Sequence, residues 1–317
     1  MSLAFVFPGQ GSQSVGMLAE LADADPAVKE TFAEASSVLG YDLWSLCQHG
    51  PEEELGVTEK TQPAMLAAGV AAWRVWKGQG GAQPVAMAGH SLGEYTALVC
   101  ANAIDFPAAV DLVRTRGRLM QEAVPLGQGA MAAILGLDDE AVEVACKAAA
   151  EGEVVEAVNF NAPGQVVVAG NTSAVNRAIE QAKQRGAKRA TLLPVSVPSH
   201  SSLMLGAAEK LAERLRDVEI RMPDVPEVFT VDLRTHESPD GIRMALKEQL
   251  HKPVRWADTV RTMFGSGVRT VVECGPGKVL TSLNRRIQKG AEFATFPIDS
   301  PASLAKALAA CRERKNA

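Results

Sequence analysis

Short apolar runs alternate with amphipathic stretches along the first part of the chain. Residues 3–7 and 84–88 are apolar runs of strand length, and they predict buried β-strands. Residues 107–123 predict a well-formed helix with a proline in its first turn, and further helices are predicted over residues 26–39 and 63–76. Buried strands that alternate with helices favour an α/β core built on a parallel sheet.

A different order of elements occupies the middle of the chain. The pattern predicts strand, helix, two strands, helix and strand, over residues 130–137, 138–150, 154–160, 165–169, 173–185 and 188–193. This β-α-β-β-α-β order is typical of a ferredoxin-like unit. We therefore predict an inserted ferredoxin-like subdomain over residues 126–194, which divides the α/β domain into residues 1–125 and 195–317. The α/β pattern resumes with a helix at 203–215, a strand at 269–273 and a helix at 279–287.

Composition and charge exclude several classes of protein. The formal net charge is −5 and there is no run of lysine or arginine, which argues against nucleic-acid binding. The longest apolar run, residues 64–76, is too short to span a bilayer and contains Arg74, so we expect no membrane span. The five cysteines are scattered and form no C-x-x-C pair. They predict reduced thiols in a cytoplasmic protein and no metal site.

The stretch Gly89-His90-Ser91-Leu92-Gly93 has the form G-x-S-x-G. It lies between the predicted strand at 84–88 and a predicted helix that starts at Glu94. A strand-to-helix elbow of this kind holds a serine hydroxyl clear of the sheet, at the N-terminus of a helix. The context therefore predicts that Ser91 is a nucleophile.

A serine hydroxyl needs a base near neutral pH, and the chain has five histidines. His200 follows a strand-like segment, in the kind of strand-end loop where α/β sheets gather functional groups. His90 adjoins Ser91, but neighbouring side chains on a tight elbow diverge. The remaining three, His49, His236 and His251, lie in predicted loops or near a turn. We therefore prefer His200. Because no acidic residue stands out as its partner, a backbone carbonyl is the alternative that orients the imidazole.

Arg116 occupies an unusual position on the helix predicted over residues 107–123. Its neighbours three and four residues away are all apolar: Leu112, Val113, Leu119 and Met120. Arg116 is thus predicted to face the core, with Arg114 and Arg118 outside. A buried guanidinium without an anion is costly, by several kcal/mol. Two partners are compatible with this position. One is a protein carboxylate in an ion pair, and the other is a substrate carboxylate bound by the guanidinium in a bidentate contact.

Taken together, six motifs in one order give the chain a specific likeness. They are residues 7–13 (FPGQGSQ), 89–94 (GHSLGE), 116–122 (RGRLMQE), 159–165 (NFNAPGQ), 195–200 (VSVPSH) and 273–278 (ECGPGK). On these motifs the chain resembles the malonyl-CoA:acyl carrier protein transacylase family over almost its whole length. The resemblance implies an α/β-hydrolase-like core with an inserted ferredoxin-like subdomain. It also implies malonyl transfer from malonyl-CoA to the phosphopantetheine thiol of acyl carrier protein, in fatty acid biosynthesis, by a monomer without a bound cofactor.

The resemblance also assigns roles to individual residues. It implies Ser91 as the acylated nucleophile, His200 as its base and Arg116 as the partner of the malonyl carboxylate. For the oxyanion hole it implies the backbone N–H groups of Gln10 and Leu92. The main-chain carbonyl of Gln249 is implied as the group that orients the histidine, which agrees with the missing acid.

Two other functions are compatible with parts of the pattern. A serine hydrolase shares the elbow and the serine–histidine pair, but the core-facing Arg116 and the absence of a late histidine favour transfer. A non-catalytic docking module is disfavoured because Ser91, His200 and Arg116 are all present. Two groups of basic residues are alternative docking sites for an acidic carrier protein. These are Lys188 with Arg189, and Lys278 with Arg285, Arg286 and Lys289.

Overall fold

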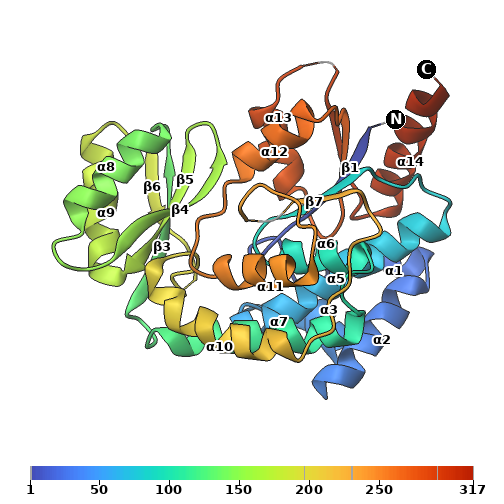
Figure 1. Ribbon diagram of the computed structural model, residues 1–317, viewed down its shortest axis with the longest axis horizontal. Helices are drawn as coiled ribbons and strands as arrows, with labels where there is room; N and C mark the ends of the chain where they lie inside the picture. Colours follow the sequence, from blue (N-terminus) through green and yellow to red (C-terminus); the bar gives the residue numbers. More distant parts are fainter. Residues whose placement is uncertain (1, 196, 230, 291, 317) are drawn as a thin grey trace.

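Strand β1 (Leu3–Phe7) lies at the centre of a five-stranded parallel sheet (Figure 1). The computed structural model describes residues 2–195, 197–229, 231–290 and 292–316. The strand order is β7-β2-β1-β8-β9, and every neighbouring pair is parallel. The other strands are β2 (Ala86–Gly89), β7 (Glu227–Phe229), β8 (Thr270–Glu273) and β9 (Ala294–Pro297). The predicted parallel-sheet α/β core is thus confirmed.

Helices cover both faces of the parallel sheet. Alternate side chains of a strand point to opposite faces, so Leu3, Phe5 and Phe7 join one core and Ala4 and Val6 another. The first core includes helices α5 (Thr58–Gly78) and α7 (Phe106–Ala123), and the second includes α12 (Trp256–Gly265) and α13 (Val279–Ile287). Burial on both faces explains why these strands are continuous apolar runs rather than alternating ones.

The remaining helices outside the antiparallel unit are mostly short. They are α1 (Ala19–Ala24), α2 (Ala27–Leu39), α3 (Leu43–His49), α4 (Glu52–Leu55), α6 (Gly93–Cys100), α10 (Leu205–Arg216), α11 (Pro239–Glu248) and α14 (Pro301–Asn316), with a 3₁₀ turn at Ser202–Met204. The helices predicted at 26–39, 107–123, 203–215 and 279–287 are confirmed to within two residues. The pattern did not predict the short strands β7 and β9 or the helices α1, α3, α4, α11, α12 and α14.

The predicted start of helix α5 at residue 63 is wrong. The helix begins at Thr58, and Pro63 lies inside it. A proline there removes one backbone donor from the helical ladder. Every residue from Thr61 to Trp73 is buried, and the packing of this apolar helix offsets the lost hydrogen bond.

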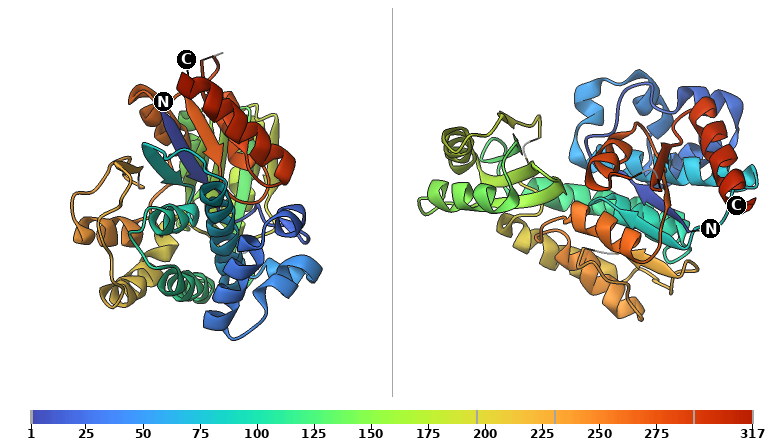
Figure 2. Two further views of the ribbon diagram at one scale, coloured as in Figure 1. Left: turned by 90° about the vertical axis from the view of Figure 1, so that its right-hand side faces the viewer. Right: turned by 90° about the horizontal axis from the view of Figure 1, so that it is seen from above.

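The middle of the chain forms a separate antiparallel sheet with strand order β4-β5-β3-β6. Its strands are β3 (Gly129–Leu135), β4 (Val155–Ala162), β5 (Gln165–Asn171) and β6 (Arg189–Leu192), and helices α8 (Asp139–Ala149) and α9 (Thr172–Gln184) share a core with it. The order of strands and helices along the chain is the predicted one. This unit extends to one side of the parallel sheet in Figure 1 and in the right-hand view of Figure 2.

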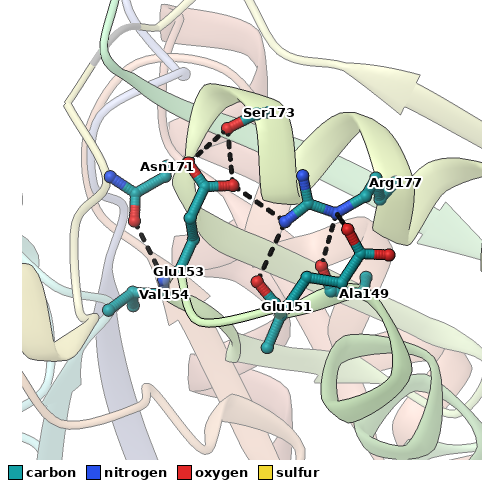
Figure 3. Close-up of polar contacts among 8 residues, drawn as sticks. Ala149, Glu151, Glu153, Val154, Asn171, Ser173 and Arg177 are labelled. Atoms are coloured by element: carbon teal, nitrogen blue, oxygen red, sulfur yellow. Dashed lines mark hydrogen bonds and ion pairs between the residues drawn. The ribbon is translucent and has the colours of Figure 1, made fainter.

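Arg177 ties the end of helix α8 to the start of helix α9 (Figure 3). Its guanidinium donates to the carbonyls of Ala149 and Ala150 at 2.8 and 2.9 Å, where the helix leaves its last carbonyls without helical donors. It also pairs with Glu153 at 2.8 Å, and Ser173 Oγ donates to the same carboxylate at 2.6 Å. The cluster therefore closes the turn between α8 and strand β4.

A short backbone bridge connects the antiparallel unit to the large one. The Phe160 N–H donates to the Val254 carbonyl at 2.9 Å, and the Val254 N–H donates to the Val158 carbonyl at 2.8 Å. The bridge places Val254, just before helix α12, alongside the middle of strand β4. No helix within the described ranges is long and apolar enough to cross a membrane.

Candidate active site

The elbow between strand β2 and helix α6 holds Ser91 in a strained conformation. Ser91 has a φ of 52°, in the left-handed region that side chains with a Cβ seldom adopt. The turn is tight, because a Cβ on Gly93 would lie 2.0 Å from the Phe7 carbonyl oxygen. A Cβ on Gly89 would lie 1.8 Å from the Gly93 carbonyl carbon. Glycine at both flanks is therefore a steric requirement of the elbow.

Gly93→Ala is expected to destabilise the fold. The added methyl group would meet backbone atoms of strand β1, which cannot move without disturbing the central sheet. Overpacking of this kind costs about 1–3 kcal/mol or more, so we expect a loss of about 3 kcal/mol in the free energy of unfolding. Urea denaturation measures it. Gly206→Ala is a matched control, because nothing lies within 4 Å of a Cβ at that helical position. Equal midpoints for the two variants would contradict the steric argument.

His200 lies against the serine. Its Nε2 is 2.8 Å from Ser91 Oγ, and its Nδ1 donates to the main-chain carbonyl of Gln249 at 2.7 Å. That contact fixes the tautomer with a bare Nε2 facing the hydroxyl. The strand expected directly before His200 is not present: β6 ends at Leu192, residues 193–195 and 197–199 belong to no strand, and Ser196 lies outside the described residues. The arrangement is a serine–histidine pair oriented by a backbone carbonyl.

Arg116 reaches the same hydroxyl from helix α7 and is 1% exposed. Its Nη2 donates to Gln249 Oε1 at 2.8 Å and to Ser91 Oγ at 3.3 Å, and its Nη1 donates to Gln62 Oε1 at 2.9 Å. All three acceptors are neutral. Within the described ranges no carboxylate lies at ion-pair distance from this guanidinium. Of the two partners that the sequence left open, a protein ion pair is therefore disfavoured.

Burial decides the protonation of these groups. Burial, with the nearby charge of Arg116, lowers the pKa of His200 to about 3, so the imidazole is neutral at pH 7. Burial also lowers the pKa of Arg116, although an arginine stays charged in proteins. Glu94, in the first turn of helix α6, has its pKa raised to about 8 by burial. The site thus contains a neutral base beside a permanent cation.

Gln10 and Leu92 belong to the two loops that flank the serine. Gln10 follows strand β1, whose last residue Phe7 pairs with Gly89 and accepts from the His90 N–H at 2.9 Å. Leu92 is the N-cap residue of helix α6 and is 1% exposed. Neither backbone N–H donates a hydrogen bond to another described residue. Both N–H groups are therefore unengaged among the described residues, one directly after Ser91 and the other after the strand that pairs with β2.

The other histidines do not approach Ser91 Oγ. His90 turns toward the antiparallel unit, where its Nε2 lies 2.8 Å from Asn161 Oδ1 and its ring packs against Trp256. His49 contacts Ser45 on helix α3. His236 lies near Asp232, and His251 is partly exposed.

The chain matches known proteins over nearly its whole length. Residues 4–296 match the acyl transferase domain family. The malonyl CoA-acyl carrier protein transacylase of Escherichia coli strain K12 is 57% identical over 305 residues, which cover 96% of this chain and 98% of the relative. The Bacillus subtilis relative of the same name is 44% identical over 99% of this chain and 98% of its own length.

The chain belongs to the malonyl CoA-acyl carrier protein transacylase family. A crystal structure of an acyl carrier protein S-malonyltransferase from Vibrio cholerae is 56% identical and superposes with a TM-score of 0.93, covering 96% of this chain and 99% of the other. A malonyl-transacylase solved in complex with a type II polyketide synthase acyl-carrier protein is 55% identical and superposes with a TM-score of 0.96, covering 98% of this chain and all of the other.

Several polar residues of this transacylase site were not found from the sequence. Gln62 is 1% exposed and its Oε1 accepts from Arg116 Nη1, but the predicted helix began at residue 63 and left Gln62 outside it. The sequence pattern indicates no separate role for Glu94 beyond its motif, and none for Tyr95, whose ring lies 5.4 Å from Arg116 Cζ. A polar residue next to proline in an otherwise buried helix was the available signal for Gln62.

Within the described ranges no group of three His, Cys, Asp or Glu side chains is arranged for a metal ion.

Proposed function

We propose that the chain moves a malonyl group from malonyl-CoA to the phosphopantetheine thiol of acyl carrier protein, in fatty acid biosynthesis. The observation that carries the proposal is a buried guanidinium 3.3 Å from Ser91 Oγ, with no carboxylate of the described residues at ion-pair distance from it. A diacid thioester supplies that missing charge with its free end. The names of the relatives describe the same reaction. The nucleophile, base and cation all come from the chain, so the proposal includes no bound cofactor.

In the first half-reaction Ser91 attacks the malonyl thioester. His200 Nε2 takes the hydroxyl proton as the Ser91 Oγ–carbon bond forms. The Gln10 and Leu92 N–H groups are proposed to receive the tetrahedral oxyanion, and each such donor is worth about 2.7–4 kcal/mol in a preorganised site. The carbon–sulfur bond then breaks, and His200 returns the proton to the coenzyme A sulfur. Malonyl-Ser91 remains.

In the second half-reaction the carrier thiol replaces coenzyme A. His200 takes the thiol proton as sulfur attacks the ester, and it returns that proton to Ser91 Oγ when the ester bond breaks. Water competes with the thiol at this stage. Burial of His200, Arg116 and Gln249 at 3%, 1% and 1% exposure limits that competition. A transferase needs such a site more than a hydrolase does.

The proposal includes the organisation of the chain. Residues 1–125 and 195–317 form an α/β-hydrolase-like domain, and residues 126–194 form an inserted ferredoxin-like subdomain, with the protein acting as a monomer. The elbow between β2 and α6 supports the first name. The β-α-β-β-α-β order in one antiparallel sheet supports the second. A cytoplasmic location completes the proposal, because Cys47, Cys100, Cys146 and Cys274 form no disulfide among the described residues.

The two candidate docking groups differ in their surroundings. Lys188 and Arg189 are exposed at the start of strand β6. In the second group, Arg285 donates to the Thr295 carbonyl at 3.3 Å and Arg286 to the Pro163 carbonyl at 3.2 Å. The second group therefore spans the two units, but part of its donor capacity is already used. Both stay candidates for the acidic carrier.

The lowered pKa of His200 predicts a flat acid limb in the pH profile. The imidazole must be neutral to accept the Ser91 proton. The ability of His200 to act as a base is therefore lost only as the pH falls toward its pKa in the folded protein, about 3. We expect kcat/KM for acylation to stay level from about pH 7 down to about pH 5, whereas an unperturbed histidine would titrate near pH 6.5. Rapid-quench measurement of acyl-enzyme at each pH tests this. A midpoint near the unperturbed value would contradict it.

Intact mass spectrometry tests the proposed reaction directly. The protein is mixed with malonyl-CoA alone, with acetyl-CoA alone, and with malonyl-CoA followed by carrier protein bearing phosphopantetheine. We expect one malonyl adduct on Ser91 that stalls without the carrier and transfers when the carrier arrives. Steady release of malonate would instead indicate a hydrolase. Absence of any adduct would indicate a non-catalytic protein.

A further inference from the structure

Glu94 is a buried carboxyl that the mechanism above does not use. It lies in the first turn of helix α6, three residues after Ser91, and is 2% exposed. Within the described ranges no lysine or arginine lies at ion-pair distance from it. Its Oε2 accepts a hydrogen bond from Gln249 Nε2 at 2.7 Å. A glutamate is almost never fully buried without a charged partner, so this contact requires an explanation.

The amide of Gln249 is held at both of its ends. Its Nε2 donates to Glu94 Oε2 and to the Ser91 carbonyl, at 2.7 and 3.0 Å. Its Oε1 accepts from Arg116 Nη2 at 2.8 Å. The two ends of an amide differ, since the nitrogen only donates and the oxygen only accepts. Two acceptors on the nitrogen therefore fix the oxygen toward the guanidinium. If the amide were flipped, the Gln249 N–H groups would face the N–H groups of the Arg116 guanidinium.

We infer that Glu94 is a positioning residue for substrate selection, which acts through the Gln249 amide to keep the Arg116 guanidinium aimed at Ser91. The inference rests on the proposed function, because it takes the carboxylate of the acyl group as the partner of Arg116. Glu94 contributes as a hydrogen-bond acceptor. Its charge is secondary, in agreement with a pKa that burial raises to about 8. An amide side chain at position 94 should therefore serve nearly as well.

The first test compares two variants on two substrates. Glu94→Leu removes the acceptor, and Glu94→Gln keeps one. For Glu94→Leu we expect kcat/KM for acylation by malonyl-CoA to fall about tenfold, the size of one lost buried hydrogen bond. The loss should lie mainly in KM, because binding of the carboxylate is weakened. Acylation by acetyl-CoA, which has no carboxylate for Arg116, should change little. Glu94→Gln should keep the malonyl-to-acetyl ratio of the unmodified protein.

The second test asks whether the effect passes through Arg116. In an Arg116→Ala background, Glu94→Leu should not change the malonyl-to-acetyl ratio further. The effects of two substitutions are not additive when one residue acts through the other. Glu122→Leu is a matched control. This glutamate is exposed near the end of helix α7 and pairs with Arg118. Its loss should leave the ratio unchanged.

The outcomes separate this inference from the proposed function. Failure of the unmodified protein to load malonyl would overturn the proposed function. If the unmodified protein loads malonyl normally, any one of three results overturns the inference alone. The first is that Glu94→Leu lowers kcat/KM equally for malonyl-CoA and acetyl-CoA, and the second is that Glu94→Gln lowers the malonyl-to-acetyl ratio as much as Glu94→Leu does. The third result is that Glu94→Leu still lowers the ratio in the Arg116→Ala background. If Glu94→Leu does not fold, as judged by circular dichroism, Glu94→Met provides a second apolar replacement for the same comparison.

Discussion

Arg116→Ala is expected to reverse the acyl preference of the protein. In this variant the malonyl carboxylate would enter a buried site without its cation. Removing one partner of a buried charge pair costs about 3–5 kcal/mol, so kcat/KM for malonyl loading should fall about 10²–10⁴-fold. Acetyl loading should be unchanged or faster, because an acetyl group leaves no charge unpaired. Acylation of Ser91 by each coenzyme A ester, followed by intact mass, gives both rates.

The control for Arg116→Ala comes from the same helix. Arg118 lies two residues away, is about half exposed and pairs with Glu122 at 3.2 Å. Arg118→Ala should leave the malonyl-to-acetyl ratio of the unmodified protein in place. Equal losses for malonyl and acetyl in Arg116→Ala would show that this arginine supports the fold rather than the choice of substrate.

His200→Ala is expected to slow acylation of Ser91 by about 10²–10⁴-fold, the usual contribution of a positioned general base. The loss should appear in kcat, since His200 contacts the hydroxyl at 2.8 Å and the mechanism gives it no contact with the malonyl carboxylate. Single-turnover kinetics with malonyl-CoA measure the step. His49→Ala, on helix α3, serves as the control. Comparable rates for the two variants would mean that another group accepts the proton.

The sequence predicted those parts of the site that depend on local pattern. The apolar run before Ser91 and the glycines around it predict an elbow, since backbone sterics leave few alternatives. The burial of Arg116 followed from helical periodicity alone, because its neighbours at three and four residues are apolar. Both features depend on residues that are close along the chain.

Contacts between distant segments were beyond that reasoning. The hydrogen bond from His200 to the Gln249 carbonyl joins a loop to the end of helix α11, and Gln249 was named only through the family resemblance. The hydrogen bonds from Arg116 to Gln62 and from Gln249 to Glu94 join side chains of separate helices, and polar residues that meet in this way have no periodic signature. Strand β7 was missed for a related reason. Three residues are too few to show a pattern, and the strand exists because strand β2 offers it an open edge.

The bridge between Val254 and strand β4 has a practical consequence for engineering. Strand β4 of the antiparallel unit is held to Val254 by this bridge, and its Asn161 side chain contacts the side chain of His90, the residue immediately before the nucleophile. The antiparallel unit is therefore not an interchangeable module. A chimera that exchanges it to alter carrier preference should retain Val158, Phe160 and Asn161 from the recipient. Otherwise the graft disturbs the serine elbow along with the surface it was meant to replace.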